Sequence, residues 1–539
     1  MLTSVQDFHS RTGAISLHLS LLTLALTWSA PLLAKPDSQE IRILIDQPPL
    51  QLNPRQSVDA MGQRINSLLY RGLTQIDAQL TPNPDLAQNW ISSADGLSWT
   101  FEISPHAQDT NGAPLTAQTI RECLENYRAG KPTALAIKSS FSSWVSTQIT
   151  APNRVTLKLD RPDPFLPRNA SALRFFRVKG QAVACTEPKS GELLTGTGKY
   201  QLTSAKRDQE KELRLEPTGA EQFPVVFEIV RDESSRALKL LKGEADAVQN
   251  QLSVSKIRWI QQAHSERFSI IERDGVNVSY LAFNVKDPTL KNQKVREAIS
   301  RAIPRDQIIE HKMFGFGSPA ASFLSPHLTE SSHSTLHGRM PYSPQISETL
   351  LDEAGYPRSR DKQTGIRFEL KYRTTPVREG LETARIIQDA LRKIGIEVIL
   401  EVVEPATFLS SIRKGGFQLY SSRWIGVADG SILYRTLQSS QPNNRVGYTN
   451  PVADLILERA MSELNPQIRN RLLAQAQEIM ISDLPYFPLW FWSNALVVRK
   501  DWAPLITPEK LSLSGAFGPL LDVLQAAKLQ VSSSVSSRK

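Results

Sequence analysis

Apolar residues follow strand-like and helix-like spacings in alternation along this chain. Residues 366–372 alternate like a strand, residues 382–394 have helical spacing that ends at Gly395, and residues 397–403 alternate again. This order is a βαβ unit, which requires a mostly parallel sheet. Nearer the amino terminus there are further strand-like runs at Glu40–Ile45 and Trp99–Ile103 and helix-like runs at Met61–Tyr70 and Ala117–Tyr127. The chain is therefore predicted to be an α/β protein.

The first 34 residues have the pattern of a secretory signal peptide. Arg11 stands in a short polar start, an apolar run covers residues 14–26, and Ala34 precedes Lys35 at the expected cleavage point. A membrane anchor is the alternative, but it needs ~20 predominantly apolar residues, and serine, threonine and histidine interrupt this run. No cysteine stands at the cleavage point to accept a lipid. We expect a soluble periplasmic protein that is not lipid-anchored.

Length and composition predict several folding units. The 539 residues exceed the ~250–300 that one hydrophobic core usually supports. Hydrophobic residues make up 40% of the chain and charged residues 22%, which is typical of a folded globular protein. The formal net charge is +9, but the basic residues form no long run, so nucleic acid is not an expected partner.

The two cysteines leave their own state open. Cys123 and Cys185 form a disulfide in one reading, which an oxidising compartment permits, and they remain buried thiols in the other. They have no histidines nearby, so they lack the spacing of a zinc site.

Changes in composition mark boundaries between segments. They fall at Lys189–Gly198, at Arg273–Asn277 and in the Ser/His/Pro-rich segment Ser325–Ser343, which we expect to be a surface loop. The tail Val531–Lys539 is rich in serine and charge, and we expect it to be disordered.

Signatures of catalysis are absent from the sequence. It has no zinc-protease, nucleophile-elbow, Walker or dinucleotide motif. The sequence Gly196-Thr197-Gly198 is interpreted as a tight turn. His333 and His337 are four residues apart, which suits metal ligands on a helix, but their serine-rich surroundings favour a loop. We predict no enzyme activity, no cofactor and no metal.

Adjacent acidic residues do not change this prediction. Asp232 and Glu233, like Asp352 and Glu353, are neighbours in sequence. Neighbouring side chains diverge on a helix or a strand, so these carboxylates are interpreted as solvated charges rather than as an acid/base pair.

A collinear series of short motifs resembles the peptide/nickel family of ABC-importer substrate-binding proteins. The series covers almost the whole chain after residue 34. Its motifs are Tyr70–Leu73, Pro84–Ala87, Asp95–Phe101, Asn111–Ala117, Gly196–Tyr200 with Lys199 in place of proline, Leu241–Asp246, Tyr280–Asn284, Val295–Ile299, Leu350–Tyr356, Gly447–Pro451 and Pro485–Leu489. Each motif is weak alone, and their common order and spacing carry the resemblance.

The resemblance implies a two-lobed periplasmic-binding-protein-like fold of type II, in its large class. Lobe I comprises residues 35–66, 189–277 and 487–530, an extra subdomain at 67–188 is inserted in it, and lobe II comprises 278–486. Hinges are expected near Arg273–Asn277 and Leu489–Ser493.

The implied function is solute capture. The lobes close on a short peptide or peptide-like solute, which the protein, expected to be a monomer, delivers to an ABC permease in the inner membrane. Two alternatives stay open: a ligand sensor for a membrane signalling partner, and a receptor for a metal chelate, a sugar or an amino-sugar derivative.

One segment departs from the family pattern. Peptide-binding members carry an aspartate three residues after the tryptophan that corresponds to Trp424, and it pairs with the peptide ammonium, whereas this chain has Val427. Either Asp429 takes that role, or the ligand has no free ammonium there. Trp424 is expected to be an aromatic wall of the ligand site, with core packing as its alternative. Arg423 is a candidate partner for a ligand carboxylate, with exposure to solvent as its alternative.

Overall fold

The structure is a computed structural model. It describes residues 39–57, 59–129, 133–178, 184–188, 192, 194–202, 211–220, 222–358 and 365–536, without the side chains of 135–136 and 534–536. The predicted signal peptide lies outside the described residues.

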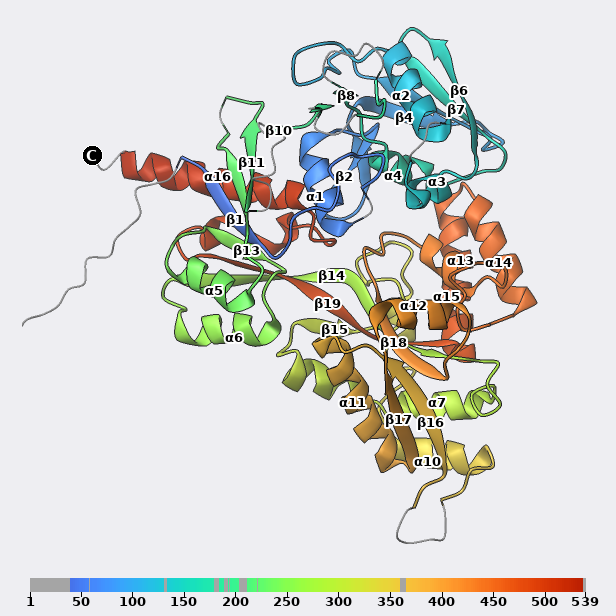
Figure 1. The fold of residues 1–539 in the computed structure, drawn as a ribbon. Coiled ribbons are helices and arrows are strands. Elements are labelled where there is room, and N and C mark those ends of the chain that lie inside the picture. Colours follow the sequence, from blue (N-terminus) through green and yellow to red (C-terminus); the bar gives the residue numbers. More distant parts are fainter. Residues whose placement is uncertain are drawn as a thin grey trace, which may run out of the picture. The chain divides into compact units, whose positions relative to one another are not determined.

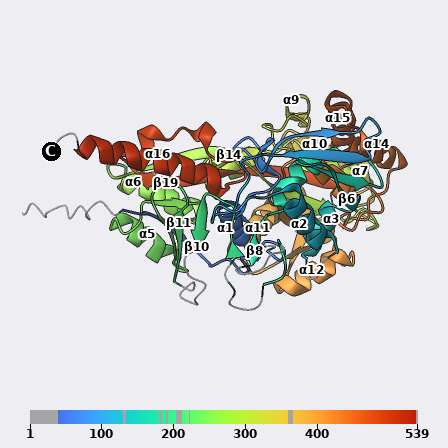
Figure 2. The same ribbon diagram turned by 90° about the horizontal axis from the view of Figure 1, so that it is seen from above.

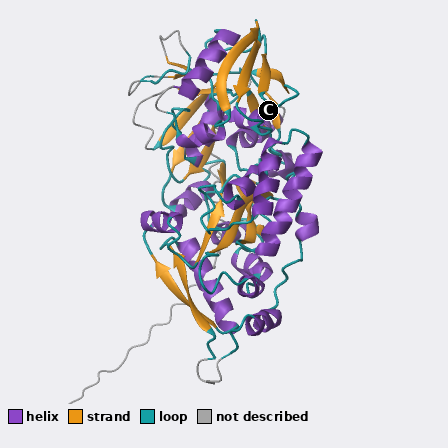
Figure 3. Cartoon of the chain, turned by 90° about the vertical axis from the view of Figure 1, so that its right-hand side faces the viewer, coloured by secondary structure: helices purple, strands orange, loops and turns teal. Residues whose placement is uncertain are grey.

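The largest element is a mixed sheet of eleven strands. Its strands are β1 (Ile41–Ile45), β10 (Tyr200–Leu202), β11 (Glu212–Pro217), β12 (Val225–Ile229), β13 (Ala247–Gln249), β14 (Phe268–Phe283), β15 (Gly317–Pro319), β16 (Phe368–Thr374), β17 (Ile396–Val402), β18 (Leu419–Trp424) and β19 (Tyr486–Arg499). Their order is β10-β11-β12-β1-β13-β19-β14-β18-β16-β17, and β15 pairs with β19. Figure 3 shows the mixture of helices and strands, and they alternate along much of the chain, as the sequence predicts.

Helices cover this sheet. At the end of the sheet that contains β10, β11, β12, β1 and β13 lie α1 (Ala60–Leu69), α5 (Glu233–Leu241), α6 (Val254–Ala263), α16 (Phe517–Ser536) and the short turns η4 (Ala503–Leu505) and η5 (Pro508–Lys510). Near its last strands lie α7 (Gln293–Arg301), α8 (Arg305–Gln307), the π-helical turn η3 (Ile308–Lys312), α9 (His333–Leu336), α10 (Pro344–Glu353), α11 (Arg378–Lys393), α12 (Pro405–Arg413), α13 (Ser431–Leu437), α14 (Pro451–Ser462) and α15 (Pro466–Asp483). Figure 2 shows the long helix α16 at the carboxy-terminal end of the chain.

The predicted βαβ unit is present. Strand β16, helix α11 and strand β17 follow one another, and β16 pairs with β17 in parallel from Phe368 opposite Ile396 to Thr374 opposite Val402. Helix α11 begins at Arg378, four residues before the predicted start, and Gly395 after it has a φ of 84°, which favours glycine. The predictions for β1, β5 (Ser98–Ile103), α1 and α2 (Ala117–Ala129) are likewise confirmed, within two residues at each end.

A second, four-stranded sheet belongs to the segment between α1 and β10. This segment contains β2 (Thr74–Ile76), β3 (Pro82–Pro84), β4 (Ala87–Ser92), β5 (Ser98–Ile103), α2 (Ala117–Ala129), α3 (Leu135–Ser140), β6 (Trp144–Ala151), β7 (Arg154–Leu159), α4 (Leu166–Asn169), η1 (Ala170–Ala172), β8 (Arg177–Val178) and β9 (Leu194–Thr195). The sheet order is β4-β5-β7-β6. Its core is continuous with the core under β1, because Phe101 and Leu124 join the same buried cluster as Ile43. The inserted subdomain therefore shares its core with the first strands.

The main sheet has a hydrophobic core on each of its two faces at one end, and another pair of cores at its other end. One face of β1 and β13 packs in the cluster that includes α1 and α16, and the other face packs against α5 and α6. We call this part, with the four-stranded sheet, lobe I. At the other end, Tyr280 packs on the side of α14 and α15, while its neighbour Leu281 packs on the side of α7 and α11. We call this second part lobe II. The part of β14 that is buried on both faces, Tyr280–Phe283, is apolar without interruption.

Only the long strands β14 and β19 belong to both lobes within the described sheet. They pair antiparallel over most of their length (Figure 1), and the pairing shifts between Arg273 and Asn277. On β14, Ile271 packs in lobe I and Val276 packs in lobe II. On β19, the change falls between Phe491 and Ala495, a few residues after the predicted boundary at 486–487. The irregular pairing thus lies where the chain passes from one core to the other.

A glycine permits close contact at this crossing. A Cβ on Gly275 would lie 2.2 Å from the carbonyl oxygen of Trp492 on the opposite strand. No side chain fits at that distance, so only glycine allows the two backbones to approach here.

The carboxy-terminal tail differs from the expected disorder. Helix α16 extends to Ser536, although the sequence predicts disorder from residue 531, so residues 531–536 are helical. Residues 537–539 lie outside the described residues.

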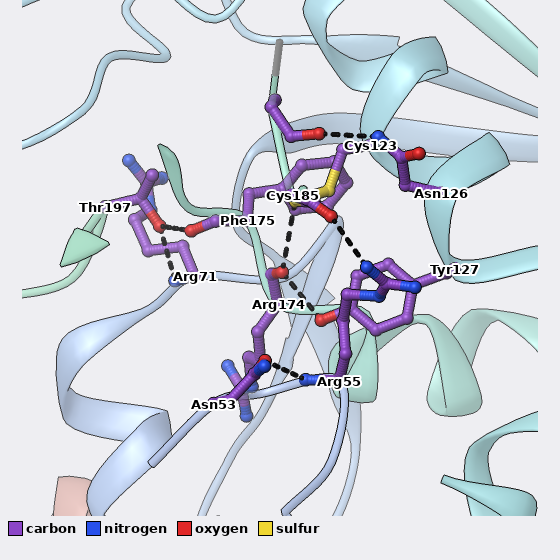
Figure 4. Close-up of a disulfide and its surroundings, with 11 residues drawn as sticks. Asn53, Arg55, Arg71, Cys123, Asn126, Tyr127, Arg174, Phe175, Cys185 and Thr197 are labelled. Carbon is purple, nitrogen blue, oxygen red and sulfur yellow. Dashed lines mark hydrogen bonds between the residues drawn. A yellow bond between two sulfur atoms is a disulfide. The ribbon is translucent and has the colours of Figure 1, made fainter. Parts of the chain in front are cut away.

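Cys123 and Cys185 form a disulfide with their Cα atoms 4.8 Å apart (Figure 4).

The disulfide ties helix α2 to the segment 184–188. Both cysteines are fully buried, and Asn126 Nδ2 donates a 2.9 Å hydrogen bond to the carbonyl of Ala184. Arg55 Nη1 donates to the carbonyl of Cys185 at 3.3 Å. The cross-link thus fixes a segment that contributes only two residues, Ala184 and Cys185, to the core.

The disulfide is expected to stabilise the inserted subdomain. It links residues 62 apart in sequence, and closing a loop of that length in the unfolded chain is worth roughly 2–5 kcal/mol. The double variant Cys123→Ser with Cys185→Ser should lose that amount in urea unfolding relative to the oxidised protein. Reductant should lower the wild-type midpoint and leave that of the variant unchanged. Equal stability of the oxidised protein and the variant would contradict this expectation.

Candidate functional site

The candidate site lies around the end of β18, close to the crossing between the lobes. Trp424, the last residue of β18, pairs with Val278 of β14. The segment 425–430 then leads into α13. Its Gly426 has a φ of 65°, and its backbone N–H donates a 2.8 Å hydrogen bond to Asn277 Oδ1. The segment is therefore anchored to β14 at the point where the β14–β19 pairing is irregular.

Trp424 has one ring face on the core of lobe II. Its ring stacks on that of Tyr280 with centroids 5.4 Å apart and an interplanar angle of 17°. The Trp424 side chain is only partly buried, and its Nε1 makes no hydrogen bond to any described residue. Trp424 thus packs on the core while part of it remains uncovered, and its role as an aromatic wall of the ligand site stays a prediction.

Arg423 lies on the opposite face of β18. Its guanidinium forms an ion pair with Glu379 of α11 and stacks over the ring of Trp492, 4.0 Å from the ring centre. Burial lowers the pKa of Arg423. Arg423 already has an anionic partner and an aromatic one, and it is not brought together with the free side of Trp424.

Val427 is a core residue. It is 2% exposed and belongs to the apolar cluster of lobe II that contains Tyr280 and Leu473. The replacement of an aspartate by valine at this position therefore has a packing role, because an unpaired carboxylate at this depth would be costly.

Asp429 is buried and paired. It is 6% exposed, its Oδ1 accepts a 3.0 Å hydrogen bond from the backbone N–H of Ser431, and its Oδ2 lies 3.5 Å from Arg168 Nε. Arg168 belongs to α4 in the inserted subdomain, and it also donates to the carbonyl of Leu80. An ion pair that the sequence gives no means of foreseeing thus joins the subdomain of lobe I to lobe II.

Further contacts surround this ion pair. Arg469 of α15 lies over the ring of Phe165 at 5.5 Å, and Leu80 packs into the lobe II core. Burial, together with the nearby charge of Asp429, raises the pKa of Asp163 to about 6. An ion pair and apolar packing therefore both act where the inserted subdomain meets lobe II.

Sequence reasoning missed a group of residues that pack around Trp424. These residues are Tyr280, Tyr420, Tyr486 and Arg445. The ring of Tyr280 contacts those of Tyr420 and Tyr486 at 6.1 and 5.4 Å, and the Arg445 guanidinium lies 5.5 Å from the ring centre of Trp424. The alternation of β14 and β18 places Tyr280 and Tyr420 on one face, but no local signal marks Arg445, which is far from both in sequence.

Clusters of side chains typical of metal sites are absent from the residues that the structure describes. They contain no group of three or more histidine, cysteine, aspartate or glutamate side chains that could hold a metal ion. The rings of His333 and His337 stack 5.0 Å apart at the short helix α9. Gly196 and Gly198 approach the carbonyls of Leu69 and Leu68 so closely that a Cβ would lie 2.3 and 2.1 Å from them, so these glycines permit close backbone contact with the end of α1 rather than the predicted tight turn. Asp232 caps helix α5.

A surface cavity of about 390 Å³ lies elsewhere in the molecule. It is lined by Arg258 of α6 and by residues of the α8–β15 region that include Asp306, Glu310 and Phe314. None of the residues predicted for the site lines it. None of the helices described between residues 39 and 536 has the length and apolar character needed to cross a membrane.

Solved structures with the same architecture define the class of protein. HbpA2 from Haemophilus parasuis is 23% identical, with a TM-score of 0.74, and the match covers 86% of this chain and 96% of that one. NikA from Brucella suis, in complex with Fe(III)-EDTA, is 19% identical with a TM-score of 0.75, and the match covers 87% and 97%. These likenesses show the fold: a two-lobed α/β binding protein of the periplasmic type II class, as predicted.

The sequence comparisons show the family. The model of bacterial extracellular solute-binding proteins, family 5 (middle), matches residues 81–445, and the chain belongs to this family. The dipeptide-binding protein DppE of Bacillus subtilis is 24% identical over 475 residues, which are 83% of this chain and 84% of DppE. The periplasmic murein peptide-binding protein MppA of Escherichia coli is 25% identical over 512 residues, 89% and 93% of the two chains. The resemblance inferred from the short motifs is thereby confirmed.

The ion pair between Arg168 and Asp429 is expected to stabilise the contact between the inserted subdomain and lobe II. Replacing Arg168 by methionine leaves the buried Asp429 carboxylate without its counter-ion, which should cost about 3–5 kcal/mol of unfolding free energy. Adding Asp429→Asn to that variant should recover most of the loss, because the charge that needs a partner is then gone.

The matched control is Arg161→Met, which removes an exposed arginine that pairs with Asp160. That change should cost less than about 1 kcal/mol in the same urea titration. Equal losses in Arg168→Met and Arg161→Met would show that the Arg168–Asp429 pair contributes nothing.

Proposed function

We propose that this protein captures a short peptide or peptide-like solute outside the cytoplasm and delivers it to the membrane permease of an ABC importer. The observation that carries the proposal is the family match, which spans residues 81–445. The names of the relatives DppE and MppA support peptides as the class of solute. The signal-like residues 1–34 support export, and we propose that the mature protein is a monomer without catalytic activity.

Closure of the two lobes is the proposed means of capture. The pairing of the crossing strands β14 and β19 is irregular between Arg273 and Asn277, opposite Trp492–Asn494, and again between Ser279 and Tyr280. A short stretch of disrupted pairing is the kind of segment that absorbs the change in φ and ψ during a hinge motion. We propose that the hinge lies there and that Asn277, through its bond to Gly426, moves the site segment with it.

The roles of the predicted site residues follow from their surroundings. Trp424 is proposed as the aromatic wall against the solute, since part of its ring is uncovered. Asp429 is proposed to act in closure through Arg168, because its carboxylate already has a cation in this conformation. Arg423 and Val427 are proposed to support β18 and the segment after it. The solute would then have no free ammonium next to Val427.

A test of this function starts from what the protein carries. Mature protein purified without refolding is expected to retain a solute whose mass, measured under native conditions, is that of a short peptide. Calorimetry with a panel of di- to pentapeptides should show saturable binding without release of products. Retention of a metal chelate or a sugar, or steady hydrolysis of the peptide, would overturn the proposal.

The binding site itself is tested by a pair of tryptophan variants. Trp424→Ala should weaken peptide binding at least tenfold, which corresponds to about 1.4 kcal/mol, because the solute loses its aromatic wall. Trp259→Ala, at an exposed tryptophan on α6, should leave the affinity unchanged. Equal effects of the two changes would place the solute away from Trp424.

A further inference from the structure

The two lobes meet on both sides of the β14–β19 pair. In the sheet, β18 lies beside β14 and β13 lies beside β19. On the β14 side, the segment after β18 contacts the inserted subdomain through the Arg168–Asp429 ion pair. On the β19 side, β15 of lobe II pairs with β19, and the cavity of about 390 Å³ is lined by α6 of lobe I and by residues that lead into β15. The contacts between the lobes therefore form two groups, one on each side of the crossing.

An apolar contact fixes the turn before β15 to both lobes. Phe316 is buried in the lobe I core with Ile257 of α6, whereas Met313 is buried in the lobe II core. Between them, Phe314 has a φ of 52°, which is unusual for an aromatic residue and makes the turn tight. Because this turn is packed into both cores, a rotation of the lobes is expected to pivot close to it.

Opposite charges face each other across the cavity without pairing. Arg258 of α6 lines one wall, and Asp306 and Glu310 line the other. All three are exposed, and within the described chain Arg258 forms no ion pair and donates to a glutamine side chain on its own helix, at 3.0 Å. His311 Nε2 lies 3.8 Å from Glu310 Oε2. Burial lowers the pKa of the neighbouring Arg305, and the charge of Asp306 opposes that shift. Neither carboxylate is thus paired with Arg258 in this conformation.

One rotation changes the two sides of the crossing in opposite directions. A rotation that separates Asp429 from Arg168 moves α6 toward α8 and η3, because the turn at Phe316 stays fixed to both lobes. An ion pair forms when the charged atoms come within about 4 Å, so this movement brings Arg258 to the carboxylates across the cavity. In the present conformation the Arg168–Asp429 contact is made and Arg258 is unpaired, which agrees with this alternation.

We propose that Arg258 forms a latch with Asp306 or Glu310 that holds the lobes open and is broken when they close. This inference rests on the hinge motion in the proposed function and adds a contact that sets the balance between the open and closed forms. The solute is held by the closed form, so a latch that favours the open form lowers the apparent affinity and favours release of the solute.

Charge reversal tests the latch by calorimetry with the peptide of the panel that wild-type protein binds most tightly. Arg258→Glu places like charges across the cavity and should tighten binding by about three- to tenfold, because the open form loses its ion pair. Arg258→Gln removes the attraction without adding repulsion, so it should tighten binding by less. Lys256→Glu makes the same change of charge on the same helix, outside the cavity lining, and should leave the affinity unchanged.

Reversal of a partner charge identifies the pair. Adding Asp306→Arg or Glu310→Arg to Arg258→Glu recreates an ion pair of inverted polarity, and at least one of the two double variants should return to the wild-type affinity. With saturating peptide, the radius of gyration from small-angle X-ray scattering should be the same for wild type and Arg258→Glu, because the latch is absent from the closed form.

The outcomes separate the latch from the function on which it rests. The latch is wrong, and peptide capture stands, if Arg258→Glu binds no more tightly than wild type, if Lys256→Glu tightens binding as much, or if neither double variant restores the wild-type affinity. A different radius of gyration with bound peptide would also overturn the latch, because Arg258 would then act in the closed form. If no peptide of the panel binds the wild-type protein, the proposed function fails and the latch fails with it.

Discussion

The antiparallel pairing of β14 with β19 is the constraint on which the rest of the structure depends. These two strands are the only described ones that belong to the cores of both lobes, so every other contact is placed relative to them. Their pairing shifts register between Arg273 and Asn277, where Gly275 lets the backbones approach, and again between Ser279 and Tyr280. A crossing that is paired on both sides of a short irregular stretch keeps the lobes attached while allowing the backbone to bend there.

The candidate site is built from the same strands. Trp424 ends β18 directly beside β14, and the next residues are fixed to Asn277 through Gly426. Arg423 pairs with Glu379 on one face of β18, and Asp429 pairs with Arg168 of the inserted subdomain.

Much of the fold could be predicted from the sequence because it depends on local patterns. The alternation of apolar residues and Gly395 locate the βαβ unit around α11, and the order of short motifs identifies the family. The disulfide stayed undecided because Cys123 and Cys185 are brought together only by tertiary packing. Arg168 and Arg445 were missed for the same reason: each meets its neighbours from a distant part of the chain, and an isolated arginine in a sequence resembles any solvated charge. Asp429 was singled out as a candidate partner for a ligand ammonium, which stays a prediction, and its ion pair with Arg168 is visible only in the folded structure.

The central claim is that the two lobes move about the β14–β19 crossing when a solute binds. Small-angle X-ray scattering of the mature protein, with and without saturating peptide, measures this most directly, because the radius of gyration reports the separation of the lobes. The radius of gyration of the mature protein is expected to be smaller when peptide is bound than when it is absent. An unchanged radius of gyration, in a sample that calorimetry shows to be saturated with peptide, would contradict it.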